Sequence, residues 1–481
     1  MSRLHSGSYM MAMKITALAA MLAAGGCAGP QRFEPEVVAL PDMAANEQQT
    51  KQALHVGQLQ HQWWAQLGSP QLNRLMDEAQ LDNIDVRQAL LRISKASAAL
   101  DGENADLWPT LSASASASQK QALNDASGRS NSTGLNLSAS YTVDLWQRRG
   151  TLIEQAELDV VAAEVDLASA RITLQSNLVT QYLDWLSTKA RLQLAQQNLQ
   201  ASREMESLVQ IRFDAGDASG IEMAQQRNTT LSLLGSAVSL QQQLAVNQRA
   251  LAALLGRSNL QIHLGDEHFD QLQIPRVASV QPAELLTQRP DIVASELALR
   301  QRHQDIYLAE SDRWPSLSLS AGLSPADLMS LAGNWTLSLT EALSVTLFDA
   351  GSKAAAVAEA EVEEAVARLE YRRIVIDAMQ ETLDAMEAVD YERQQTELAV
   401  DTLENNQELL ALADIRYQYG DTDFSDLLNA QRTFFNARDS LVVQRQKHIQ
   451  ALVELYVAFG VAPALEGAVS LDETPSFYSA Q

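Results

Sequence analysis

The placement of the prolines is the strongest constraint on this chain. None occurs between Pro109 and Pro275, or between Pro325 and Pro463. Because proline breaks the interior of an α-helix, two such windows permit unusually long helices. A helix of about 65 residues rises about 100 Å. A rod of that length cannot fold around one globular core, so it has to pack side by side with other helices.

The sequence is also repeated internally. The segment WPTLSAS from Trp108 matches WPSLSLS from Trp314, 206 positions later. The segment IRFDAGD from Ile211 matches IRYQYGD from Ile415, 204 positions later. Matches at a nearly constant spacing predict a unit of about 200 residues that is used twice.

Within each unit the sequence predicts one helix, two strands, a very long helix and a final helix. Apolar residues recur every seven positions in the long segments, as in helices that pack side by side. The clearest stripes are Ile153, Val160, Leu167, Leu174 and, in the second unit, Val362, Leu369, Ile376, Leu383. The predicted long helices are 147–214, 220–256, 351–419 and 423–460.

Two segments per unit change to an alternation of apolar and polar residues. They are about ten residues long, the length of a membrane-crossing β-strand. The predicted strands are 110–119, 135–145, 315–323 and 335–347, and the tryptophans that flank them as an interfacial girdle are Trp108, Trp146, Trp314 and Trp335. Glu341 falls among the apolar positions, so we expect it near a membrane edge, or the strand to begin after it. The alternative is a soluble sheet of two hairpins that caps a helical bundle.

Four strands are too few for a closed membrane barrel, since the smallest common one has eight. Open strand edges are not tolerated in lipid, so the chain is expected to oligomerise. Two copies give eight strands, whose interior side chains fill the barrel, whereas three copies give about twelve. The predicted fold class is therefore mainly α with a small membrane β part, in two tandem repeats that assemble as a trimer.

The N-terminus carries a targeting signal. Residues 14–27 read KITALAAMLAAGGC, with Lys14 before an apolar run and Cys27, the single cysteine, at the end. The segment resembles a bacterial lipoprotein signal that is cleaved before Cys27, which then carries lipid. By the convention of such proteins, Ala28 after the cysteine directs the product to the outer membrane. The alternative is an ordinary secretory signal whose cysteine stays free.

Composition excludes several functions. The net charge of −25 repels phosphate backbones and argues against nucleic-acid binding. A single cysteine excludes an intrachain disulfide framework. The loop that carries His263 and His268 looks like a solvated connector, so we expect no metal site there. Neither a catalytic constellation nor a Gly-rich nucleotide cradle is found, and we expect no enzyme activity and no cofactor.

Three segments together resemble one family. They are HQWWAQLGSPQLNRLMDEAQ from His61, RPDIVASELALRQ from Arg289 and RYQYGDTDFSDLLNAQRTFFNARDSL from Arg416. The chain resembles TolC-like outer-membrane channels, in the lipoprotein branch that serves resistance-nodulation-division (RND) efflux pumps. The resemblance implies a homotrimer with a 12-strand β-barrel in the outer membrane and a long α-helical barrel in the periplasm. It also implies that small molecules arrive from an inner-membrane pump through a periplasmic adaptor.

The turns that join the long helices are the expected working parts. The second turn carries Asp421, Asp423 and Asp426, and a trimer would gather these carboxylates near one constriction that attracts cations. The alternative is that they are solvated turn and N-cap residues. By resemblance, Asp426 stands in the family's acidic ring, and Tyr417 and Glu222 match a tyrosine–carboxylate hydrogen bond that holds the closed gate.

The same resemblance assigns the adaptor-docking positions and the domain plan. The docking residues are Gly216, Asp217, Ser219, Gly420 and Thr422. The expected segments are a signal peptide (1–26), a lipidated linker (27–60), repeat 1 (61–260), a connector (261–281), repeat 2 (282–463) and a tail (464–481). Two other functions stay open: the outer-membrane channel of a type I protein secretion system, and a trimeric coiled-coil surface structural protein.

Overall fold

The computed structural model describes residues 62–121, 129–275, 289–325 and 335–460. The expected signal peptide, Cys27, the linker and the tail all lie outside the described residues. Every statement below concerns the described part of the chain.

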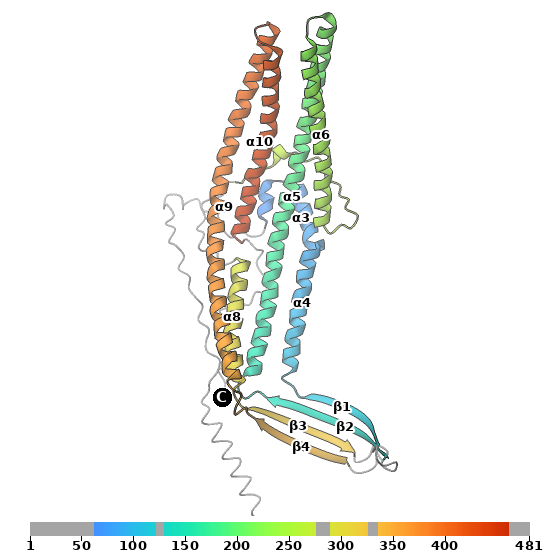
Figure 1. Ribbon diagram of the computed structural model, residues 1–481, viewed down its shortest axis with the longest axis vertical. Coiled ribbons are helices and arrows are strands. Elements are labelled where there is room, and N and C mark those ends of the chain that lie inside the picture. Colours follow the sequence, from blue (N-terminus) through green and yellow to red (C-terminus); the bar gives the residue numbers. More distant parts are fainter. Residues whose placement is uncertain (1–61, 122–128, 276–288, 326–334, 461–481) are drawn as a thin grey trace, which may run out of the picture. The chain divides into compact units, whose positions relative to one another are not determined.

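The elements follow one another in the same order twice (Figure 1). The first set is η2 (Trp63–Leu67), α3 (Pro70–Asp82), α4 (Ile84–Ala105), β1 (Thr110–Gln121), β2 (Arg129–Val143), α5 (Arg148–Ala215) and α6 (Gly220–Leu254). A short helix, η3 (Phe269–Gln271), lies between the sets. The second set is α8 (Pro290–Ser311), β3 (Ser316–Pro325), β4 (Trp335–Ser344), α9 (Ser352–Gln418) and α10 (Phe424–Ala458). The predicted class, mainly α with a small sheet in two tandem repeats, is confirmed.

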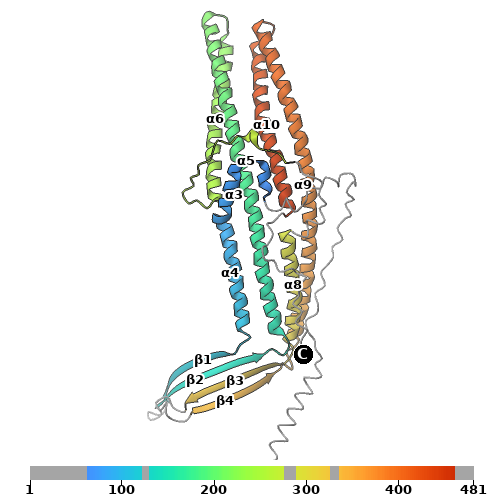
Figure 2. The same ribbon diagram turned by 180° about the vertical axis from the view of Figure 1, so that it is seen from behind.

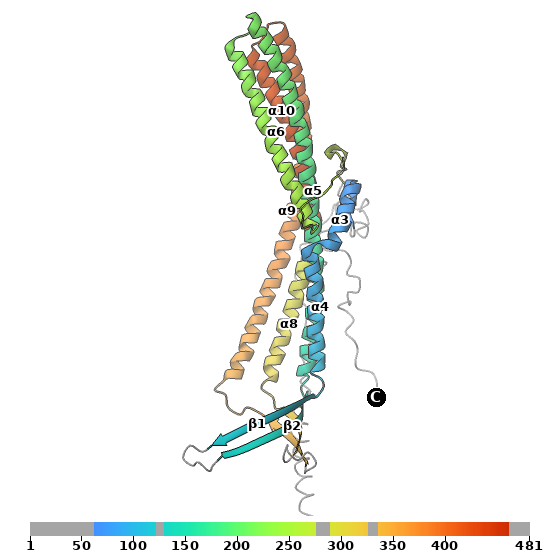
Figure 3. The ribbon, with the colours of Figure 1, turned by 90° about the vertical axis from the view of Figure 1, so that its right-hand side faces the viewer.

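The chain divides into two compact units. The first includes Ser94–Val161 and Glu296–Glu370, which hold the sheet and the adjoining ends of the helices. The second includes, among the described residues, 62–93, 162–275, 289–295 and 371–460. In this second unit α5 lies beside α6, and α9 lies beside α10, as two helical hairpins (Figure 3). No described helix is both long enough and apolar enough to cross a bilayer.

The four strands form one antiparallel sheet in the order β1–β2–β3–β4 (Figures 1 and 2). The register keeps the two faces chemically distinct: Leu137 of β2 lies opposite Leu323 of β3, and Ser140 lies opposite Ser320. Leucines, alanines and valines therefore share one face, and serines and threonines the other.

The end of the second hairpin differs from the sequence prediction. Glu341 pairs with Leu319 inside β4, so the expectation that the strand begins after this residue was wrong. The strand also ends at Ser344, before the predicted end near residue 347. Leu347 and Phe348 beyond it are 91% and 88% exposed.

The main hydrophobic core of the second unit gathers around the middle of α5. Leu178 and Tyr182 are fully buried there, beside Leu251 of α6. Trp63 of η2 stacks on Tyr456 of α10, with ring centroids 4.9 Å apart. This core ties the start of the first repeat to the ends of both helical hairpins.

The described part of the connector, up to residue 275, is not the solvated loop that the sequence predicts. Ile262, Phe269 and Leu272 are buried. One carboxylate oxygen of Glu267 accepts hydrogen bonds from the Tyr182 hydroxyl at 2.6 Å and the Ser69 hydroxyl at 2.5 Å. Its other oxygen accepts from the Gln71 backbone N–H at 2.8 Å. Glu267 thus caps the N-terminus of α3 and fastens the connector to α5.

Candidate functional site at the helical turns

Each pair of long helices is joined by a turn of the same local geometry. A glycine lies within two residues of the end of the first helix in both cases, with φ of +85° at Gly216 and +77° at Gly420. The following N–H reaches back into the helix: Asp217 donates to the Arg212 carbonyl at 2.8 Å, and Asp421 to the Arg416 carbonyl at 2.9 Å. This left-handed ending satisfies helix-terminal carbonyls and suits glycine, which has no Cβ. The chain reverses direction tightly at both turns.

The first turn is closed by a capping box. The Ser219 hydroxyl accepts from the Glu222 N–H at 3.2 Å, and the Glu222 carboxylate accepts from the Ser219 N–H at 2.6 Å. Both side chains therefore satisfy backbone donors at the start of α6. The carboxylate that the family resemblance assigns to the gate is engaged within its own turn.

The second turn places three carboxylates on its surface. Asp421, Asp423 and Asp426 are exposed. Asp423 is the N-cap residue of α10, but its carboxylate makes no capping hydrogen bond. Asp426 lies in the first turn of that helix and accepts from the Thr422 hydroxyl at 2.5 Å. Asp426 therefore places a carboxylate at the N-terminus of α10, where negative charge interacts favourably with the helix dipole.

Tyr417 is bound by an arginine of the other helical hairpin. The Arg212 guanidinium donates to the Tyr417 hydroxyl, and its central carbon lies 5.2 Å from the ring centroid. The Glu222 carboxylate is held by the Ser219 backbone, and Arg212 lies against the tyrosine ring. The expected Tyr417–Glu222 hydrogen bond stays a prediction, because a hydroxyl that accepts from an arginine can still donate its own proton to a carboxylate.

A small hydrophobic core lies beneath the two turns. Its buried members are Val209 of α5 with Phe424 and Leu427 of α10. Met223 of α6 and Tyr417 of α9 pack against them, so all four helices contribute. The two helical hairpins of one chain are thus held together at their tips, and the Tyr417–Arg212 contact lies at this junction.

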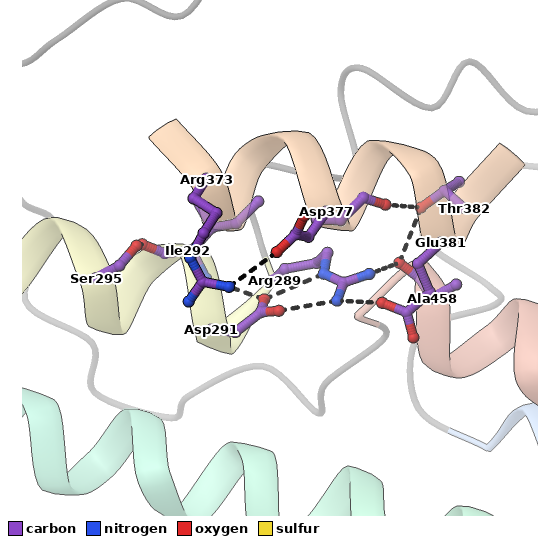
Figure 4. Close-up of polar contacts among 10 residues, drawn as sticks. Arg289, Asp291, Ile292, Ser295, Arg373, Asp377, Glu381, Thr382 and Ala458 are labelled. Carbon is purple, nitrogen blue, oxygen red and sulfur yellow. Dashed lines mark hydrogen bonds and ion pairs between the residues drawn. The ribbon is translucent and has the colours of Figure 1, made fainter. Parts of the chain in front are cut away.

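A third cluster, which sequence reasoning missed, lies at the other end of the second hairpin (Figure 4). Arg289 is only 8% exposed, and it donates to the Ala458 carbonyl at 2.7 Å, to Asp291 at 2.8 Å and to Glu381 at 2.7 Å. Burial alone would lower the pKa of this guanidinium, but the two carboxylates raise it on balance. The arginine joins the start of α8 to α9 and to the C-terminus of α10.

The first repeat has a neutral counterpart of this cluster. The Asn83 side chain donates to the Leu254 carbonyl at 2.8 Å, at the C-terminus of α6. A glycine follows each helix, and a Cβ on Gly460 would lie 2.5 Å from the Arg289 Cγ. Two features of the sequence belong to this cluster: the segment RPDI from Arg289, and Gly460 at the end of the second repeat. They lie almost a whole repeat apart in the chain, so no local pattern joins them.

The flanking tryptophans lie at both ends of the strands. Trp146 and Trp314 are partly buried against each other, with centroids 5.3 Å apart, and the Trp146 indole donates to the Pro315 carbonyl at 2.8 Å. Trp108 is 75% exposed and Trp335 46% exposed. Trp335 begins β4 at the hairpin end, whereas the other three adjoin the helices. In the described residues, no group of three or more His, Cys, Asp or Glu could hold a metal ion.

Comparison with known proteins decides the family. A sequence model described as "Outer membrane efflux protein" matches residues 75–257 and 282–461, one match per repeat. The chain belongs to this family. It is 31% identical over 419 residues to the pyoverdine export outer membrane protein OpmQ of Pseudomonas aeruginosa, covering 83% of this chain and 87% of that protein. It is 28% identical over 398 residues to the cation efflux system protein CusC of Escherichia coli K12, covering 81% of this chain and 86% of that protein.

Solved structures agree with this assignment. The outer-membrane channel OprN superposes with a TM-score of 0.80 at 26% identity, over 91% of this chain and 99% of that chain. A crystal structure of CusC superposes with a TM-score of 0.79 at 25% identity, over 90% of this chain and 99% of that chain. The protein is therefore an outer-membrane efflux channel, and its matched relatives are transport proteins.

Proposed function

We propose that this protein is the exit duct of a tripartite RND-type efflux pump and works as a homotrimer. The observation that carries the proposal is the four-stranded sheet with one apolar and one Ser/Thr face, whose outer strands each have one partner. A lipid bilayer does not tolerate open strand edges, and four strands cannot close a barrel. Three copies would close one of about twelve strands around a polar lumen.

The remaining parts of the assembly follow from the sequence and the turns. Cys27 would carry the lipid that anchors each copy in the outer membrane. The turn residues Gly216, Asp217, Ser219, Gly420 and Thr422 would receive the helical hairpins of a periplasmic adaptor. An inner-membrane pump would supply the energy. The matched relatives are named for pyoverdine, cations and toluene, so we propose small molecules as cargo.

The periplasmic gate would be an iris formed by the tips of the three copies. Asp421, Asp423 and Asp426 would gather around the opening and attract cations while repelling anions. Tyr417 would hold α9 inward through its contact with Arg212, and Glu222 would stiffen the neighbouring turn. Docking of the adaptor would release these contacts and let the inner helices rotate outward.

Single-channel recording tests the duct and its gate together. The double variant Asp426→Ala, Tyr417→Phe should raise the conductance in planar bilayers and admit vancomycin into cells that produce it. The matched control is Asp401→Ala, an exposed carboxylate elsewhere on α9. Unchanged conductance and leakage in the double variant would remove the gate, whereas a protein that never conducts would remove the duct.

A further inference from the structure

The two outer strands of the sheet have a free edge. In the described part of the chain, β1 pairs with β2 alone and β4 pairs with β3 alone. Side chains along and beyond these edges are exposed: Leu111 of β1 by 69%, Leu343 of β4 by 51%, and Leu347 after β4 by 91%. Such an edge presents unpaired backbone donors and acceptors that another strand can bind.

The internal repeat supplies a template for that strand. In the first hairpin Leu111 lies opposite Ala139, and in the second Leu317 lies opposite Leu343. The segments WPTLSAS and WPSLSLS align β1 with β3 at an offset of 206 positions, and the strand pairs then require that each β2 residue corresponds to the β4 residue 204 positions later. The helices keep the second offset, because α6 and α10 are both 35 residues long and begin 204 positions apart.

The central ladder of the sheet then shows how two repeats join. There β2 pairs with β3 in the antiparallel sense, with Val143 opposite Leu317. The direction of β4 matches that of β2, and the direction of β1 matches that of β3. Replacing each residue by its equivalent gives the facing pairs Glu341–Ala117, Leu343–Ala115, Val345–Ala113 and Leu347–Leu111, each between two copies.

We propose that β4 of one copy pairs with β1 of a second copy in this register, with Leu347 opposite Leu111. The inference rests on the proposed homotrimer and specifies how its copies join. The contact between copies repeats the contact between the two repeats of one chain, so the sheet continues around the assembly with one kind of joint.

The burial of the equivalent residues supports this joint. Val143 and Leu317, which face each other within the chain, are both partly buried. Their equivalents Leu347 and Leu111 are 91% and 69% exposed. At this end of the sheet the outer edges therefore expose apolar side chains whose equivalents in the central ladder are partly buried, as expected of a surface that a second copy covers.

The tryptophans next to the strands show the same contrast. Trp314 is partly buried because Trp146 and Tyr307 pack on its ring, at 5.3 and 5.7 Å. Its equivalent in the first repeat, Trp108, is 75% exposed, and Phe348 in the segment after β4 is 88% exposed. In the proposed joint, the segment after β4 of one copy lies beside Trp108 of the second copy.

A different register is the main competitor. The dipeptide Leu145-Trp146 resembles Leu347-Phe348, 202 positions later, and that offset would place Val345 opposite Leu111. The offset of 204 is favoured, because the strand pairs require it once β1 and β3 are aligned at 206, and because the helix bounds follow it. The two registers differ by two residues, which a disulfide can distinguish.

Cysteine pairs in the full-length protein test the register. The predicted pairs are Val345→Cys with Ala113→Cys on the apolar face and Ser344→Cys with Ser114→Cys on the polar face. Both faces are tested because facing residues of an antiparallel pair alternate between hydrogen-bonded pairs, whose Cα atoms are farther apart, and non-hydrogen-bonded pairs, whose Cα atoms are closer together. Their controls, displaced by two residues, are Val345→Cys with Leu111→Cys and Ser344→Cys with Ser112→Cys. The unmodified chain, with Cys27 alone, gives the background.

After mild oxidation, covalent multimers are counted on non-reducing gels. At least one predicted pair should give about tenfold more multimer than its displaced control, because diagonal neighbours are about 7–8 Å apart and a disulfide needs about 4 Å between Cβ atoms. Cross-linking by the displaced pairs, or by none while light scattering in detergent finds three copies, overturns the register and leaves the trimer. A particle of one copy overturns the proposed function itself.

Discussion

Replacing Arg289 by alanine should destabilise the helical unit through the cluster in Figure 4. The change removes a guanidinium that is 8% exposed and donates to the Ala458 carbonyl, Asp291 and Glu381. Hydrogen bonds to charged groups contribute about 1.5–3 kcal/mol. Both carboxylates are about half exposed and regain water, so we expect a total loss of about 2–3 kcal/mol. Unfolding entropy is about 2.1 cal/mol/K per residue, which makes this a fall of about 2–3 °C in Tm.

Thermal unfolding of the detergent-purified protein, followed by tryptophan fluorescence, measures this fall. Arg289→Lys keeps the positive charge but loses the planar guanidinium, so its Tm should lie between those of the wild type and Arg289→Ala. The matched control is Arg393→Ala, which removes exposed ion pairs with Asp390 and Glu397 on one face of α9 and should leave Tm unchanged. Equal shifts in Arg289→Ala and Arg393→Ala, or no shift in either, would refute the assignment of Arg289 as an anchor.

Two further changes probe the second unit. Glu267→Gln removes a charge that accepts three hydrogen bonds and should cost about 2 kcal/mol in thermal unfolding, whereas the exposed neighbour Asp266→Asn should cost nothing measurable. Burial raises the pKa of Asp184, although hydrogen bonds from Gln446 and Gln450 oppose the shift. The folded state then disfavours the charged form, so its stability falls as pH rises from the ordinary pKa, about 3.9, through the raised pKa of the folded state. Asp184→Asn should therefore raise Tm at pH 7, and the gain should shrink toward pH 4; a gain independent of pH would contradict this reasoning.

The elements that could be predicted are those written in local patterns. The gap between Pro109 and Pro275 allowed α5, and the alternation around Leu137 marked β2. The capping box of Ser219 and Glu222 was also visible as a serine three residues before a glutamate. Reading Glu222 only as a gate residue overlooked that local competitor, and its expected bond to Tyr417 stays a prediction.

The contacts that escaped prediction are those between distant segments. Arg289 meets Ala458 across most of the second repeat, and Glu267 meets Ser69 across most of the first. No periodicity marks such a pair, because each partner reads as an ordinary polar residue in its own segment. The burial of the connector followed from the same cause, since Glu267 caps a helix that lies far back in the sequence.

The central ladder has a consequence for biogenesis. Val143 pairs with Leu317, so half of the sheet cannot form until the second hairpin has emerged from the inner membrane. By then α5 and α6 can already have formed their helical hairpin, because the hydrogen bonds of the turn between them join residues that are close in sequence. The first hairpin must wait meanwhile with both edges open, which is the state most prone to aggregate. Periplasmic chaperones should therefore bind Thr110–Val143 during secretion in preference to any helical segment.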